Sequence, residues 1–531
     1  MTLVPARRPA PICLAACLTL LLVACGDGVN EGVNEGRGAR GTIDGVVLHP
    51  PESVDITSPP TAPENATVGT DGAAPTNDVF GWTTLSKGLQ EGHLEVPLDY
   101  SHPGPGTITL YLERHLAEQP SKRIGTLLVN PGGPGYGGSS LADDAANEYG
   151  QDLLDRFDIV GWDPRGTGSS EPAIDCVSNL DHYFAVDSSP DTAAERQVLV
   201  DRGKELGAAC ERSNGSLLAH VGTADSARDM DSIRKALGEA KISYFGFSYG
   251  SELGGTWATM FPDTVRAVVL DGSVDPTLGT MARDLQQAKG FEDLFDRFLA
   301  ECSANASCAF HNGGDAAGAF DRLHEQLDRV PVKVARKGRP AVNQAMLDVA
   351  VVSSLYDRSG WGPLEAALAD LQAGDGTGIL GLYDDYNGYD RGSWDNGQEA
   401  YFAINCLDEP RRTSPADVFA HEADFAAAAP RLGRSWIEEL VYCSEWPAHT
   451  FDHVAITGAG AGPILVVGTT GDPATPFVGT QAMATTLEEG HLVVVHADQH
   501  TGYGVNDCVN KAVEGYLLRP AAPLAATTDC P

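Results

Sequence analysis

The chain has 531 residues, of which 42% are apolar and 21% charged, and its formal net charge is −37. This length suits two or three domains, or one large domain with an insertion. The excess of acidic residues argues against nucleic-acid binding, because no basic patch is present to neutralise phosphates. The charge favours solubility, and the alternative is a mild preference for cationic substrates.

The first 25 residues are typical of a bacterial export signal. Arg7 and Arg8 precede an apolar stretch, residues 12–24, that is too short to span a bilayer as a helix. The stretch ends in Leu-Val-Ala-Cys, which resembles a lipobox and predicts Cys25 as the lipidated first residue of the mature protein. We therefore expect a lipid anchor on the outer face of the cell membrane. The alternative is an ordinary secretory signal with a chance cysteine.

Residues 26–77 are rich in Gly, Asn, Asp, Glu, Pro and Thr, a composition that predicts a disordered tether. Ordered structure is expected from residue 78. The segments 92–100 and 107–117 then predict the two strands of an opening hairpin, with Pro and Gly between them.

A strand-then-helix rhythm follows the hairpin. Its strands are apolar throughout, which indicates a mostly parallel sheet covered by helices on both faces. The predicted strands are 125–130, 157–163, 242–247, 265–272, 462–470 and 490–496, with helices at 226–238 and 251–261. The rhythm is lost between about 275 and 460. We expect an α/β fold whose core comprises residues 78–274 and 461–531, with a mainly helical cap inserted at 275–460.

The sequence Gly246-Phe247-Ser248-Tyr249-Gly250 fits the nucleophile elbow G-x-S-x-G. The motif is weak alone, since glycine and serine are common in turns. Here an apolar strand precedes it and a helix follows it, which is the context the motif requires. Ser248 is therefore the predicted nucleophile.

A serine nucleophile needs a histidine base, and in this architecture the chain order is serine, acid, histidine. Three histidines lie late enough. His491 precedes the last predicted strand and His496 closes it, whereas His500 lies in the loop beyond its carboxyl end, where such sheets place their chemistry. We predict His500 as the base. Alternating metal ligands at His496 and His500 are disfavoured, because no further ligand cluster supports them.

The acid is expected at the end of a strand. Asp472 follows the strand at 462–470 and lies close to His500 in the sequence. Asp271 and Asp275 follow the preceding strand and are its competitors. Any of the three suits a turn. We predict Asp472.

Two backbone N–H groups must stabilise the oxyanion. One is that of Tyr249, directly after the nucleophile. The other is expected from the glycine-rich loop after the strand at 125–130. Gly132 and Gly133 both leave their N–H groups unobstructed, and we favour Gly133. A phosphate-binding loop is disfavoured, because no Lys-Ser/Thr follows the glycines.

Eight cysteines remain after the export signal and Cys25. An even number in an exported chain predicts disulfides, and no couple has the spacing of a zinc site. The cysteines fall in neighbouring couples along the chain. The predicted disulfides are Cys176–Cys210, Cys302–Cys308, Cys406–Cys443 and Cys508–Cys530.

The motifs NPGGPG, DPRGTGSS, GFSYGS, GDPATP and QHTGYG occur together and in order. In this the chain resembles the tripeptidyl aminopeptidases, actinobacterial α/β-hydrolase serine exopeptidases related to proline iminopeptidases, and the mycobacterial cell-envelope serine protease of the same family. The resemblance covers residues 94–530 and implies the roles given above for Ser248, Asp472 and His500. Asn130 stands where proline iminopeptidases usually have histidine, which matches the tripeptidyl branch.

The resemblance implies an exopeptidase that releases short peptides, such as tripeptides, from the amino terminus of a peptide through an acyl-enzyme. A carboxylate in the cap is the natural partner for the substrate ammonium, and Asp408 and Glu409 are the candidates. The chemistry needs no metal or cofactor, and no obligate protein partner is evident. A carboxylesterase with the same triad is the alternative. A surface-binding protein on a hydrolase fold is disfavoured by the intact triad.

Overall fold

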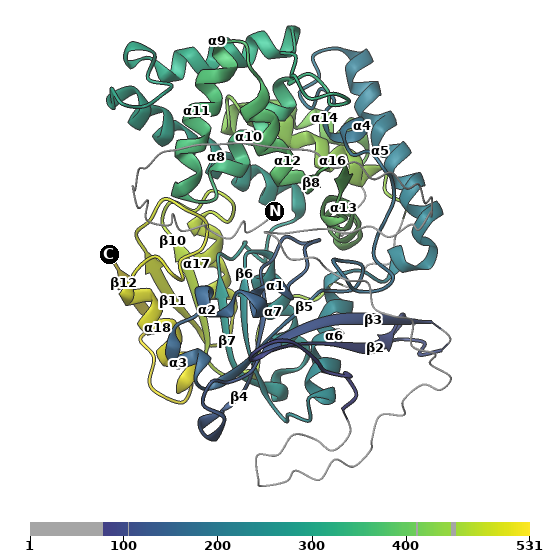
Figure 1. Ribbon diagram of the computed structural model, residues 1–531, viewed down its shortest axis with the longest axis vertical. Coiled ribbons are helices and arrows are strands. Elements are labelled where there is room, and N and C mark those ends of the chain that lie inside the picture. Colours follow the sequence, from purple (N-terminus) through teal and green to yellow (C-terminus); the bar gives the residue numbers. More distant parts are fainter. Residues whose placement is uncertain (1–77, 105, 410–412, 448–452) are drawn as a thin grey trace, which may run out of the picture. The chain divides into compact units, whose positions relative to one another are not determined.

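The computed structural model describes residues 78–104, 106–409, 413–447 and 453–531. A mostly parallel sheet of ten strands forms the base of this part of the chain (Figure 1). The export signal, Cys25 and the tether lie outside these residues. The strand order is β1-β2-β3-β5-β4-β6-β7-β10-β11-β12. The first three strands are antiparallel, β3 pairs with β5 antiparallel, and all later pairs are parallel.

The strands of this sheet have the following bounds: β1 Thr83–Ser86, β2 Leu89–Pro97, β3 Thr107–His115, β4 Gly125–Asn130, β5 Phe157–Trp162, β6 Ile242–Phe247, β7 Val265–Asp271, β10 Ile464–Thr469, β11 Gly490–Val495 and β12 Thr527–Cys530. All strands predicted from the sequence are present, with ends shifted by a few residues. β1 and β12 are additional.

Helices cover both faces of the sheet. Neighbouring residues along each strand point to opposite faces, so the side chains on both faces are buried. Leu128 and Tyr244 pack in one core with α6 (Thr223–Ala236) and α7 (Tyr249–Met260). Leu127 and Phe245 pack in another with α2 (Ala145–Glu148), α3 (Gln151–Leu154) and α18 (Asp507–Leu518). This two-sided burial explains why the strands are apolar throughout. α1 (Ser140–Asp143) and α17 (Phe477–Thr486) complete the core.

A cap of helices lies between β7 and β10 in the sequence and above the carboxyl ends of the strands in Figure 1. It has a core of its own. Its elements are α8 Thr280–Ala304, α9 Ala316–Arg329, α10 Gln344–Ser354, α11 Trp361–Gln372, α12 Thr377–Asn387, β8 Tyr389–Asp390, β9 Ser393–Trp394, α13 Gly397–Asp408, α14 Pro415–Ala420, α15 Glu422–Ala428 and α16 Ile437–Ser444. The cap is mainly helical, as the loss of strand rhythm predicts.

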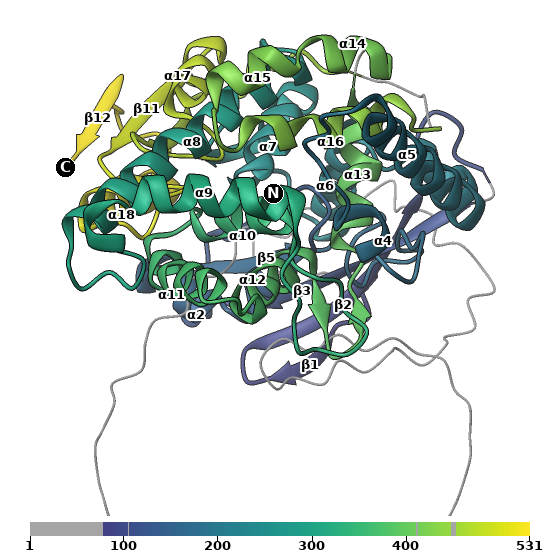
Figure 2. The same ribbon diagram turned by 90° about the horizontal axis from the view of Figure 1, so that it is seen from above.

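A second excursion joins the cap. α4 (Asp181–Phe184) and α5 (Ala193–Asn214) lie between β5 and α6 in the sequence, within the segment assigned to the core by the sequence analysis. Figures 1 and 2 show α5 beside α16. The hydroxyl of Tyr442 donates to the carbonyl of Tyr183 at 2.6 Å, and Arg339 pairs with Asp181 at 2.9 Å. The helical layer is therefore built from two separate stretches of chain.

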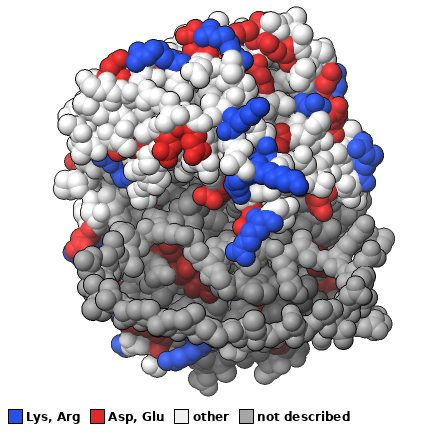
Figure 3. Space-filling view, turned by 45° about the horizontal axis from the view of Figure 1, so that its top comes forward, with Lys and Arg blue, Asp and Glu red and all other residues white. Residues whose placement is uncertain are grey.

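Four disulfides are present, with the pairings predicted from the neighbouring couples. They join Cys176 to Cys210, Cys302 to Cys308, Cys406 to Cys443 and Cys508 to Cys530. The third connects α13 to α16, and the fourth connects α18 to β12. Among the described residues, none of the helices is long and apolar enough to cross a membrane. Where described residues are visible in Figure 3, Lys and Arg side chains are interspersed with Asp and Glu.

Candidate active site

Ser248 occupies the turn between β6 and α7. Its φ of 55° lies in the left-handed region, where a residue with a side chain is strained by about 1–3 kcal/mol. Gly246 and Gly250 permit the turn, because a Cβ on Gly246 would overlap the carbonyl of Gly250. The N–H of Ser248 donates to the carbonyl of Asp271 at 2.8 Å. The strand–turn–helix context that G-x-S-x-G requires is therefore present.

Asp472 and His500 meet at the same edge of the sheet. Asp472 follows β10, and His500 lies beyond β11. The two carboxylate oxygens are 2.9 and 3.0 Å from Nδ1 of His500, and both side chains are fully buried. This contact places the imidazole proton on Nδ1, which leaves Nε2 as the basic nitrogen. Nε2 is buried and has no hydrogen-bond partner within the described part of the chain.

Several donors fix the Asp472 carboxylate. The N–H groups of Ala474 and Thr475 donate to Oδ1 at 3.0 and 2.8 Å. The Thr475 hydroxyl donates to Oδ2 at 3.0 Å and lies 3.2 Å from Nδ1 of His500. The N–H of Thr501 also donates to Oδ2, at 3.2 Å. The carboxylate is thus held in the orientation that the imidazole needs.

The competing residues have other partners. His491 lies 2.9 Å from a backbone carbonyl, and His496 lies 2.8 Å from Asp529. The Asp275 carboxylate accepts from the N–H and hydroxyl of Thr277, which is a turn. Asp271, the remaining competitor, accepts backbone N–H groups and makes no hydrogen bond to the His500 ring. The geometry favours Asp472 and His500 as the acid and the base.

The glycine-rich loop after β4 lies against the nucleophile turn. A Cβ on Gly132 would come within 2.8 Å of Ser248 Cβ and 3.0 Å of the Tyr249 nitrogen. The N–H of Gly132 donates to Oδ1 of Asn130 at 2.9 Å, so it is already used within the loop. Gly133 lines the same cavity as Ser248 and Tyr249. The position of Gly133 in this wall is compatible with the predicted role, and Gly133 as the second donor beside Tyr249 stays a prediction.

The DPRGTGSS segment supports this loop. Asp163 accepts from the N–H of Ser139 at 3.0 Å and from the N–H of Ser169 at 2.8 Å. Ser139 lies in the stretch that follows the glycines. The buried carboxylate therefore ties the end of the oxyanion loop to the segment after β5.

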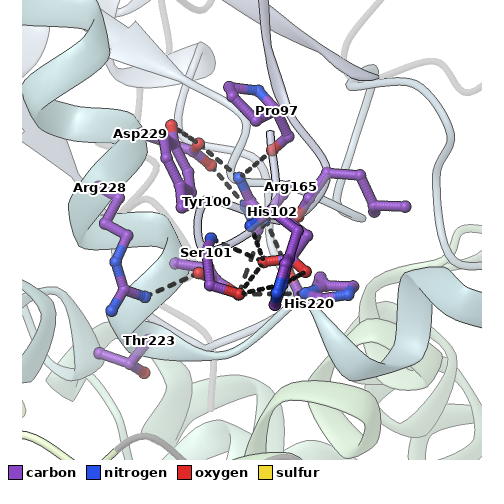
Figure 4. Close-up of polar contacts among 12 residues, drawn as sticks. Pro97, Tyr100, Ser101, His102, Arg165, His220, Thr223, Arg228 and Asp229 are labelled. Carbon is purple, nitrogen blue, oxygen red and sulfur yellow. Dashed lines mark hydrogen bonds and ion pairs between the residues drawn. The ribbon is translucent and has the colours of Figure 1, made fainter. Parts of the chain in front are cut away.

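Arg165, from the same segment, is fully buried and makes five hydrogen bonds. It forms a two-point contact with Asp229 on α6, both at 2.7 Å, and donates to the carbonyls of Pro97, Leu98 and His220 at 3.2, 3.0 and 2.8 Å (Figure 4). The guanidinium joins the end of β2, the loop before α6 and α6 itself. Its role is therefore to fix the scaffold beneath the site.

The cap closes over Ser248 and forms a shared cavity with it. The wall carries five acidic residues and one arginine: Glu252, Asp275, Asp284, Asp408, Glu439 and Arg283. Arg283 pairs with Glu252 at 3.0 Å. Tyr401 and Asn405 of α13 also line the cavity. Acidic side chains therefore outnumber basic ones in the cavity wall.

Asp284 on α8 and Glu439 on α16 are two buried acids of this wall whose pKa values are raised. Burial raises the pKa of Asp284 well above its ordinary value, and the nearby Glu439 raises it further. Burial also raises the pKa of Glu439. The hydroxyl of Tyr401 donates to Oε2 of Glu439 at 2.6 Å, whereas Oδ2 of Asp284 is buried with no hydrogen-bond partner among the described residues. An unsatisfied carboxylate oxygen in a cavity is suited to a ligand that brings donors.

Sequence reasoning missed both residues. They lie on ordinary helices of the cap, far apart in the chain, and no motif marks them. The available signal was only the general expectation that acidic residues of the cap bind the ammonium group of the substrate.

Asp408 and Glu409, the two acids predicted to bind the substrate ammonium, differ from each other in their surroundings. Asp408 lines the cavity, but its oxygens accept from Thr223, at 3.0 Å from the N–H and 2.6 Å from the hydroxyl. That hydroxyl lies 2.5 Å from the phenolic oxygen of Tyr249. Burial raises the pKa of Asp408 to about 7. Glu409 follows α13 and acts on Asp284 and Glu439 through its charge.

The cap touches the catalytic groups at two points. The N–H of His500 donates to the carbonyl of Tyr356 at 2.8 Å, and the two rings meet edge to face with centroids 5.4 Å apart. On the other side, a Cβ on Gly135 of the oxyanion loop would come within 2.8 Å of the Tyr401 Cα. The cap is therefore part of the site as well as its roof.

Comparison with known proteins places this geometry in a family. The family described as "TAP-like protein" matches residues 429–530, and that described as "alpha/beta hydrolase fold" matches residues 125–348. The chain is 34% identical over 449 residues to "Serine protease Hip1" of Mycobacterium tuberculosis, covering 81% of this chain and 85% of the relative. The chain belongs to the tripeptidyl aminopeptidase-like family of α/β hydrolases.

Other relatives in this family carry different names. The "Tripeptidyl aminopeptidase" of Streptomyces lividans is 31% identical over 456 residues, with 82% of each chain covered. "Carboxylesterase B" of M. tuberculosis is 35% identical over 443 residues, with 81% of this chain and 84% of the relative covered. The family and the predicted fold are thus confirmed, and the protein is a serine hydrolase. Its relatives are named for both peptide and ester substrates.

Proposed function

We propose that this protein is an exported serine exopeptidase that releases short peptides, such as tripeptides, from the amino terminus of peptide substrates. The observation that carries the proposal is the cavity shared by Ser248 and the acidic wall of the cap. A peptidase for chain ends needs a nucleophile and an ammonium site within one enclosed pocket. Asp284 and Glu439 supply the carboxylates, and the names of the relatives support peptides as substrates.

In the proposed reaction, Nε2 of His500 takes the proton of Ser248 as its oxygen attacks the scissile carbonyl. The N–H groups of Tyr249 and Gly133 stabilise the oxyanion. His500 then gives the proton to the leaving amine, and an acyl-enzyme on Ser248 remains. Water, deprotonated by His500, hydrolyses this ester. Asp472 fixes the imidazole tautomer and stabilises the imidazolium throughout.

The experiment compares one tripeptide amide reporter with a free amino terminus, the same reporter acetylated, and a short-chain ester. A charge-assisted hydrogen bond contributes about 1.5–3 kcal/mol, so acetylation should lower kcat/KM by about 10- to 150-fold. Equal rates on the free and blocked reporters would favour an endopeptidase or an esterase. A carboxylesterase is the second candidate, because a relative with 35% identity bears that name.

Export with a lipid anchor on Cys25 is the cellular part of the proposal. It rests on the lipobox-like end of the apolar stretch. Four disulfides support an oxidising location outside the cytoplasm.

A further inference from the structure

Asp271, at the end of β7, contacts both sides of the site without touching the reacting atoms. Its backbone carbonyl accepts the N–H of Ser248 at 2.8 Å. Its carboxylate accepts the N–H groups of Gly502 and Tyr503, each at 2.8 Å. The residue is completely buried. One residue therefore holds the nucleophile turn with its main chain and the histidine loop with its side chain.

The segment after His500 depends on this contact. Three consecutive N–H groups are shared between two carboxylates: that of Thr501 donates to Asp472, which follows β10, and the next two donate to Asp271, at the end of the adjacent strand β7. Thr501 has a φ of 66°, which is unusual for a β-branched residue. Such a strained turn persists only where its surroundings hold it in place.

Holding a turn with a buried carboxylate carries an unfavourable free energy of desolvation. Burial raises the pKa of Asp271 to about 6, although the two N–H groups and His500 act in the opposite direction. The Asp472 charge raises it as well. A neutral acceptor would be better tolerated by the fold, yet the charged group stands beside the catalytic histidine. This combination points to a role in the reaction beyond stability.

We propose that Asp271 is a positioning residue that keeps the Ser248 turn and the His500 turn in register during catalysis. The effect concerns the imidazole and the nucleophile, which act on every acyl substrate. It therefore applies equally to peptides and esters and does not depend on the exopeptidase proposal.

The test replaces Asp271 with Asn and with Ala in the full-length protein. Asn keeps one acceptor oxygen but presents an N–H₂ group to the second N–H. We expect kcat per active site, counted by titration with a serine-reactive phosphonate, to fall by about 10- to 100-fold, since small misplacements of catalytic groups have effects of this size. KM should change by less than about threefold. Asp271→Asn should leave Tm within about 3 °C, because removing the buried charge offsets part of the cost of the two facing N–H donors.

Asp263→Asn is the matched control. Asp263 lies in the short helix Pro262–Thr264 at the opposite end of β7 and should keep wild-type kinetics. Equal losses of kcat on the ester and the free peptide, with an unchanged Tm, would support the proposal. Wild-type kcat in titrated enzyme would overturn it. A series in which neither variant folds would also overturn it, because Asp271 would then be a structural residue.

Discussion

Replacing Glu439 with Gln tests the ammonium site most directly. Gln keeps the shape of the side chain and an oxygen that accepts from Tyr401, whose hydroxyl lies 2.6 Å from Oε2 in the native protein. The charge is removed, together with the long bond of 3.4 Å that Oε1 accepts from the Asn405 amide. A bond from the substrate ammonium to this carboxylate contributes about 1.5–3 kcal/mol, so kcat/KM on a free tripeptide reporter should fall by about 10- to 150-fold. Rates on the acetylated reporter and on a short ester should stay within about twofold.

Glu439→Gln should stabilise the folded protein near neutral pH, although it lowers activity on the free peptide. Burial raises the pKa of Glu439 in the folded protein. A carboxyl group with a raised pKa contributes stability at low pH, and this contribution is lost as pH rises through the folded-state pKa. Gln has no such loss, so the Tm of the variant relative to wild type should be higher at pH 7 than at pH 4. Thermal melts at the two pH values measure this difference.

Glu438→Gln is the control for Glu439→Gln. Glu438 precedes Glu439 on α16, and burial raises its pKa to about 8, but it is not among the residues that line the cavity. It should leave the ratio of free to acetylated rates unchanged. The ammonium site would be refuted if Glu439→Gln lowered the free and acetylated rates by the same factor. A loss with Asp284→Asn alone would keep the site and change only its main residue.

Ser248→Ala should lower hydrolysis of every substrate by about 10⁴-fold or more in a folded protein, as circular dichroism and rate assays would show; near-wild-type rates would contradict the triad. Asp408→Asn should lower free-peptide, blocked-peptide and ester rates alike, since the carboxylate supports Tyr249 through Thr223; a loss confined to the free peptide would instead make Asp408 the ammonium partner. Replacing Cys176 and Cys210 with Ser should cost about 4 kcal/mol of stability, as chemical unfolding would measure, because their disulfide closes a loop with a sequence separation of 34 residues. Cys25→Ser should release the protein from membranes or block its processing, and unchanged fractionation and mobility would exclude the anchor.

The placement of Ser248, Asp472 and His500 at one edge of the sheet could be predicted because each residue lies beside a strand end. Ser248, Asp472 and His500 follow apolar strands that are recognisable without a structure, and parallel strands bring their carboxyl ends to one edge. The disulfides were also predictable, since each couple is close in the chain. Local sequence was sufficient to predict a residue's position wherever the strand or partner that fixes that position lies close to it in the chain.

The other features of the site and the fold depend on tertiary packing and could not be predicted from local sequence. Asp284 and Glu439 lie on amphipathic cap helices where acids are usual on the solvent side. Only the packing of α8 and α16 within the cap brings both residues into the wall of the cavity that Ser248 also lines. Similarly, α5 has the pattern of any surface helix, although it packs on α16. The strand β1 has no buried residue, and β12 consists of Thr527–Cys530, so neither has the apolar alternation that marks a strand.

The Cys406–Cys443 disulfide fastens together the two helices that carry Tyr401 and Glu439. Before this bond forms, α13 and α16 are held together by packing and by the hydrogen bonds that Tyr401 and Asn405 donate to Glu439. Under the proposed export, a newly made chain in a reducing cytoplasm would have a looser arrangement of Tyr401 and Glu439 than the oxidised protein outside the cell. Oxidation would then act as a maturation step that completes the proposed ammonium site only after the protein had left the compartment that contains the cell's own nascent chains.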